Sequence, residues 1–174
     1  MSGAIQGVAY YVVALIAVAF VVFVDFVLIS SGSGSTSPGG LSGGSGSAVL
    51  YALGWMFYGT HFVDVSAGAL GTQNLVELLG MAGLPSFAYY LMPPVFLFLA
   101  GRSIARSTGH AGMRDEELAA RGATAVAGYL PAAVVGSIAL TRNGVGPELS
   151  TTILLMGVGY PLVFGGLGGY LSKR

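Results

Sequence analysis

The sequence predicts an all-α fold, a polytopic bundle of transmembrane helices, and three observations support this. Hydrophobic residues make up 54% of the 174 residues and charged residues only 8%, whereas water-soluble domains carry about 25% charged residues. The mean hydropathy is +0.79. Five apolar segments are long enough, or nearly so, to cross about 30 Å of hydrocarbon as helices. We therefore expect residues 1–174 to form one transmembrane domain of five segments.

The first apolar segment, residues 8–29, is the purest. Tyr10 and Tyr11 lie near one end, where aromatic side chains anchor helices at the membrane interface. A secretory signal peptide has a basic start and a shorter apolar run, whereas residues 1–7 contain no Lys or Arg, so we expect a retained helix. Asp25 lies only about 6 Å from the segment's end at 1.5 Å per residue and is interpreted as a boundary carboxylate.

The next two regions are less regular. Residues 30–47 are almost entirely Gly and Ser, which predicts a flexible, solvated tether; natural low-complexity loops and engineered linkers share this composition. The second apolar segment, residues 48–66, meets His61 and Asp64 before it is long enough to span comfortably. The alternative to five spans is therefore four spans plus a short or re-entrant second segment.

Three further segments, at residues 84–101, 122–140 and 149–171, have the length and composition of membrane helices. The first two are separated by residues 102–121, a charged loop with four arginines and three acidic residues. The stretch MRDEELAAR within this loop predicts a short solvated helix.

The basic residues predict the orientation in the cell membrane, because positively charged loops stay cytoplasmic. Six of the seven lie in the 102–121 loop or the C-terminal tail, so we expect both to be cytoplasmic and the loop at residues 66–83 to be external. If the second segment spans the membrane, the N-terminus is outside and the Gly/Ser tether is inside. If the second segment is re-entrant, both of these assignments are reversed. The uncharged N-terminus favours five spans.

Small residues predict where helices pack, since association in lipid depends on close backbone approach. Gly128, Ala132 and Gly136 recur every four residues in the fourth segment, as Gly165 and Gly169 do in the fifth. We expect the fourth and fifth segments to pack against each other through these residues. The expected partners are the lipid bilayer and either further copies of the chain, as a homo-oligomer, or another membrane protein.

A tyrosine comes shortly before a proline in each of the last three segments. A proline removes a backbone hydrogen bond and leaves a carbonyl that a tyrosine hydroxyl can satisfy. Such breaks are structural kinks or, in transporters, the lining of a substrate site. The expected helix breaks are at Pro93, Pro94, Pro131 and Pro161.

Polar residues inside apolar segments are costly and frequently functional. His61 and Asp64 are spaced i and i+3, which places them on one face of a helix that Trp55 and Tyr58 extend. Such a face suits a proton relay or two metal ligands, but Glu77 is the evident third ligand and none supplies a fourth, so we expect no metal. The candidate polar site comprises His61, Asp64, Tyr58, Trp55 and Asp25.

Several functions are excluded or disfavoured. The absence of cysteine excludes disulfides, Cys-based zinc sites, iron–sulfur clusters and thiol catalysis. A formal net charge of zero disfavours nucleic-acid binding. The apolar segments contain no HExxH, P-loop or GxSxG motif, so we expect neither enzyme activity nor a cofactor.

Three sequence blocks carry a resemblance: WMFYGTHFVDV at residues 55–65, GYLP at residues 128–131 and YPLVFGGLGG at residues 160–169. Together they resemble a haloarchaeal family of multi-span membrane proteins of unknown function, mainly over residues 50–171. Members of that family carry Asn-Ala where this chain has Gly59 and Thr60. The resemblance implies a multi-span helical fold and no particular activity.

Two functions follow as hypotheses. The glycine faces favour a structural or accessory subunit of a membrane assembly. The tyrosine–proline breaks and the His61–Asp64 face favour the alternative, a small transporter or channel for protons, cations or a small solute. A stoichiometric partner distinguishes the first from the second.

Overall fold

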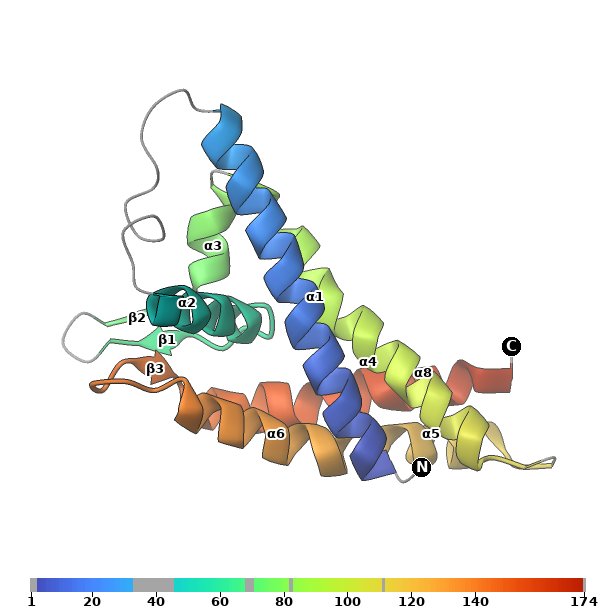
Figure 1. The fold of residues 1–174 in the computed structure, drawn as a ribbon. Helices are drawn as coiled ribbons and strands as arrows, with labels where there is room; N and C mark the ends of the chain where they lie inside the picture. Colours follow the sequence, from blue (N-terminus) through green and yellow to red (C-terminus); the bar gives the residue numbers. More distant parts are fainter. Residues whose placement is uncertain (1–2, 33–45, 68–70, 82, 111, 174) are drawn as a thin grey trace.

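The computed structural model describes residues 3–32, 46–67, 71–81, 83–110 and 112–173. It is mostly helical (Figure 1). Within these residues, four helical stretches are long and apolar enough to cross a membrane, which fits a multi-pass membrane protein. They are Gly3–Ile29, Ser86–Thr108, Asp115–Ala139 and Leu149–Lys173.

The second predicted segment is not among these four. Its helix, α2 (Gly46–Gly59), has 14 residues, or about 21 Å at 1.5 Å per residue, against about 30 Å of hydrocarbon. The described residues therefore contain four helical stretches of membrane-spanning length and a shorter α2.

The long helices form two pairs in Figure 1. Helices α1 (Gly3–Gly32) and α4 (Ser86–Thr108) run side by side. Helix α6 (Val126–Ala139), preceded by α5 (Asp115–Ala123), runs beside the C-terminal stretch. That stretch contains α7 (Leu149–Thr151), the π-helical segments η2 (Thr152–Gly159) and η3 (Pro161–Gly165), α8 (Gly166–Tyr170) and a 3₁₀ turn (Leu171–Lys173).

A small sheet connects two inter-helix regions. Its strands are β1 (Val65–Ser66), β2 (Thr72–Gln73) and β3 (Gly146–Pro147), in the order β2-β1-β3 with antiparallel pairing. Helix α3 (Leu75–Gly80) follows β2, and Asn74 caps it by accepting from the Val76 N–H. The predicted external loop thus contains ordered elements that the sequence pattern did not show.

The chain ends lie near one end of the helical body. Gln6 Nε2 donates to Ser107 Oγ at 3.1 Å, which joins the start of α1 to the end of α4. Lys173 Nζ lies 2.9 Å from a carboxylate oxygen of Asp115, at the start of α5. The start of α1 therefore lies at the same end as the C-terminal turn, unlike the opposite placement that the five-span prediction gave.

The charged loop is shorter than predicted. Helix α4 continues to Thr108 and α5 begins at Asp115, so Arg102 and Arg106 lie on α4. The short helix predicted within MRDEELAAR corresponds to the start of α5.

Two predicted packing residues of α6 face α1. A Cβ atom at Gly128 would overlap the Ala4 carbonyl, and one at Gly136 would overlap the Tyr11 and Tyr58 hydroxyls. Ala132 packs beside the main core. Gly128 therefore approaches α1, and Gly136 lies against side chains of α1 and α2.

The small residues of the last stretch meet α4 and α5. Backbone atoms of Gly165 approach Gly101 and Gly122, and Gly169 approaches Leu118 and Gly122. The fourth and fifth predicted segments therefore do pack together, and α6 lies beside η2. The residue of the fourth segment that meets Gly165 and Gly169 is Gly122, which the four-residue spacing did not include.

Three of the four prolines at which we expect breaks lie inside helices that continue past them. Helix α4 continues through Pro93 and Pro94, and α6 continues through Pro131. Only Pro161 lies in irregular helix, because the widened turns of η2 and η3 surround it. The predicted tether differs too: its first and last residues belong to α1 and α2, and residues 33–45 lie outside the described residues.

Candidate functional site

The turn after α2 places His61 inside the molecule. Helix α2 ends at Gly59, the His61 N–H donates to the Tyr58 carbonyl at 2.9 Å, and Phe62 adopts a positive φ of 58°. A left-handed residue ends a right-handed helix. The prediction that His61 and Asp64 share a helical face is therefore wrong, because the chain reverses between them.

The His61 side chain is fully buried and hydrogen-bonded on both nitrogens. Nδ1 lies 3.0 Å from the Phe57 carbonyl oxygen, which can only accept, so Nδ1 carries the proton. Nε2 then accepts from the Tyr129 hydroxyl at 2.7 Å. This is the pattern of the neutral ring, and both nitrogens are used for bonds within the protein.

The surroundings of His61 oppose protonation. Burial lowers its pKa to about 4, although the hydrogen bond to the Phe57 carbonyl acts in the opposite direction. The rings of Phe57 and Tyr160 lie 5.0 Å and 5.3 Å from the imidazole. His61 therefore lies among aromatic rings and is neutral near pH 7.

Trp55 and Tyr58, the other predicted members of this face, bond to backbone carbonyls near or in α6. Trp55 Nε1 donates to the Leu140 carbonyl at 2.9 Å, and Tyr58 Oη donates to the Ala133 carbonyl at 2.5 Å. The Tyr11 hydroxyl lies 3.1 Å from that of Tyr58. Tyr11 is thus a buried hydrogen-bonding residue and differs from the predicted interfacial anchor.

Asp25 joins α1 to the beginning of α4. It is 4% exposed, its carboxylate accepts from the Leu84 N–H at 3.0 Å, and the Tyr89 hydroxyl donates to Oδ2 at 2.5 Å. Fixed donors replace the water that a buried carboxylate loses. Asp25 is therefore enclosed by protein groups, in contrast to the hydrated boundary carboxylate expected from the sequence.

Asp64 lines an acidic pocket to which the buried His61 does not contribute. This pocket of about 350 Å³ is lined by Asp64, Thr72, Gln73, Asn74, Glu77 and Leu78. Glu77 is exposed and Asp64 is partly exposed. Across the described ranges, no group of three or more His, Cys, Asp or Glu side chains is placed to hold a metal ion.

Sequence reasoning missed the partners of these polar groups. The tyrosine–proline pattern includes Tyr129, whose hydroxyl bonds to His61 of another segment. It does not include Tyr89, whose hydroxyl bonds to Asp25. One signal was present: a tyrosine in the middle of an apolar helix must find a partner for its hydroxyl.

Comparisons with known proteins give one match. The model of a family of unknown function, DUF7978, matches residues 1–174. The match therefore includes the N-terminal segment and the Gly/Ser region, which the resemblance over residues 50–171 left out. No curated protein and no solved structure matches the chain.

Proposed function

Because the chain belongs to the DUF7978 family of unknown function, we propose a role from its geometry: an integral membrane protein that acts as a structural or accessory subunit of a membrane assembly. One observation carries the proposal. The buried polar side chains bond to each other and to backbone groups across segments, as the His61–Tyr129 and Asp25–Tyr89 pairs do.

This use of polar groups has a physical reason. Polar residues are costly in lipid, and hydrogen bonds between helices there join segments that the hydrophobic effect alone does not join. A transport site needs polar groups that face a cavity. His61 is fully buried, and both its nitrogens are already bonded to protein atoms.

The proposed orientation follows from the charges. Arg102, Arg106, Arg121 and Lys173 lie on the elements that meet at the end shared by α4, α5 and the C-terminal turn. Arg142 belongs to the turn beside the small sheet. The basic end is cytoplasmic by the positive-inside rule, so this proposal places both the start of α1 and the C-terminus inside. A haloarchaeal source remains an expectation from the sequence resemblance.

Exposed apolar side chains supply the faces for assembly. On α1, Ile16 and Phe20 are 61% and 67% exposed, and on α6, Val135 and Ile138 are 66% and 64% exposed. In a bilayer such residues meet lipid tails or a neighbouring subunit. The proposed assembly is with further copies of the chain or with another membrane protein.

Subunit counting tests this proposal. The full-length protein is extracted into lipid nanodiscs from the membranes of its source and examined by native mass spectrometry. A fixed stoichiometry, either of copies or of one partner, is expected. A uniform monomer whose reconstituted vesicles conduct protons or cations would contradict a structural role.

One observation favours the alternative of a small transporter or channel. The widened turns of η2 and η3 lie beside His61, with the Tyr160 ring 5.3 Å from the imidazole. Wide helical turns are frequent at functional sites. A vesicle flux abolished by His61→Gln but retained by His110→Gln would favour this function.

A further inference from the structure

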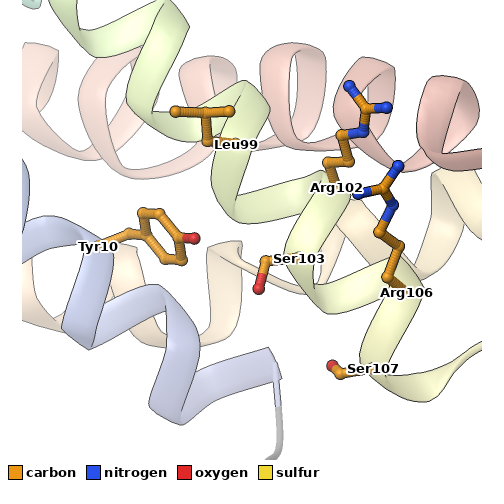
Figure 2. A pocket seen from close by; sticks show the side chains of 6 residues that line it. All are labelled: Tyr10, Leu99, Arg102, Ser103, Arg106 and Ser107. Atoms are coloured by element: carbon orange, nitrogen blue, oxygen red, sulfur yellow. The ribbon is translucent and has the colours of Figure 1, made fainter.

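A pocket near the basic end of the molecule is shared by α1 and α4 (Figure 2). Its volume is about 540 Å³, and its lining comprises Tyr10, Leu99, Arg102, Ser103, Arg106 and Ser107. The five residues from α4 are spaced by three or four positions or are direct neighbours, so they occupy one helical face. Figure 2 shows the Tyr10 ring extending from α1 toward this face.

The pocket is positively charged. Arg102 and Arg106 lie beside one another on successive turns (Figure 2), and neither loses its proton at physiological pH. None of the six lining residues is acidic. Arg106 Nε donates to the Ser172 carbonyl at 3.0 Å, which fixes the side chain while occupying one of the five N–H donors of a guanidinium.

Three hydroxyl groups also line the pocket. Ser107 Oγ accepts from Gln6 and donates to the Ile104 carbonyl at 3.0 Å, so it forms a fixed wall. Ser103 and Tyr10 add hydroxyl groups to the lining. An acceptor-only, negatively charged oxygen group suits such a lining, and arginine pairs with phosphate in a forked geometry.

We propose that this pocket binds the phosphate group of an anionic membrane lipid. The apolar residues on the same helical face support a lipid over a soluble phosphate ester. Val95 and Leu99 precede Arg102 by about two turns and one turn, and they are 47% and 45% exposed. A lipid phosphate at the arginines would leave its chains along this apolar strip, as basic pockets at helix ends hold lipid headgroups.

A binding titration tests the site without depending on the proposed function. Delipidated protein in neutral detergent is titrated with phosphatidylglycerol, phosphatidylcholine or glycerol phosphate, and bound lipid is counted by native mass spectrometry. One phosphatidylglycerol per chain is expected, with about tenfold preference over phosphatidylcholine. Because a hydrogen bond to a charged group contributes about 1.5–3 kcal/mol, Arg102→Gln is expected to weaken binding at least about tenfold.

Matched variants make the result decisive. Arg114→Gln removes an exposed arginine at the same end that is paired with Glu116 and Glu117, so it should leave binding unchanged. If Arg102→Gln fails to fold, Ser103→Asp supplies a second variant, expected to weaken binding by charge repulsion. Equal binding of both lipids, or equal loss in the Arg114 variant, would overturn the site. Equally tight binding of glycerol phosphate would overturn the lipid as its source.

Discussion

The Tyr129 hydroxyl lies 2.7 Å from Nε2 of His61 and joins α6 to the turn after α2 at a position where both side chains are fully buried. The two residues are 68 positions apart in the chain. Since the other imidazole nitrogen bonds to the Phe57 carbonyl, this histidine is completely enclosed by protein partners. Its role in our account is to hold two segments together.

Removal of the Tyr129 hydroxyl should destabilise the fold. Tyr129→Phe keeps the ring but leaves Nε2 of His61 without a donor, which costs about 1–3 kcal/mol for a buried group. Thermal unfolding in detergent measures the effect. Tyr170→Phe, at a site that is 42% exposed, serves as the control, and an equal change in both variants would contradict the assigned role.

The Asp25–Tyr89 pair should show energetic coupling. Asp25→Asn and Tyr89→Phe each remove part of a buried hydrogen bond to a charged group, expected to cost about 1.5–3 kcal/mol each. The double variant should lose less than the sum of the two, by at least about 0.5 kcal/mol, because the residues are in contact. A double-mutant cycle of unfolding free energies measures this coupling, and strict additivity would show that the contact contributes nothing.

Acid should destabilise the protein through His61. Its pKa falls from 6.5 to about 4 on burial. Between these two pH values the unfolded chain binds a proton that the folded protein does not, so the contribution of His61 to the free energy of unfolding is fully present above pH 6.5 and is lost as the pH falls toward 4. At about 1.36 kcal/mol per pKa unit, the full contribution is about 3 kcal/mol. The free energy of unfolding, measured between pH 7 and 4, should depend less on pH in His61→Gln. It should keep its pH dependence in His110→Gln, whose side chain is exposed. The same slope in both variants would exclude His61 as the cause.

Bulk at the α1–α6 contact should separate the helices. Gly128→Leu would overlap the Ala4 carbonyl and the Val8 backbone, with an expected cost of about 1–3 kcal/mol or more from overpacking. Gly46→Leu is the matched control, because a Cβ there meets nothing within 4 Å. Expression and thermal stability in detergent report the difference. If both variants behave like the unaltered protein, then α1 and α6 do not approach as described.

The sequence pattern predicted the apolar segments well because each depends mainly on local composition. The helix at Ser86–Thr108 and the stretch from Leu149 to Lys173 begin and end within a few residues of the expected ones, apart from the extension of α4 into the charged loop. The predicted end of the second segment was wrong, because apolar residues continue in the sequence after α2 ends at Gly59. The backbone reverses a few residues later, at Phe62. Composition does not reveal such a turn.

The candidate site was less predictable, because its partners come from distant parts of the chain. Four-residue spacing identified Gly128 as a close-packing position but not α1 as its neighbour. In the same way, the apolar context marked His61 and Asp25 as costly residues, and only the folded arrangement supplies Tyr129 and Tyr89 as their donors. Spacing within one helix cannot give the partner on another.

Proton flux in reconstituted vesicles tests the central claim, that the buried polar residues join segments and do not conduct. Vesicles containing the full-length protein are exposed to a pH step between about 5 and 8, the range in which an accessible histidine titrates. Our account predicts the same rate of internal acidification as in protein-free vesicles. A faster, pH-dependent rate that both His61→Gln and Asp64→Asn abolish, while each variant remains folded, would contradict it.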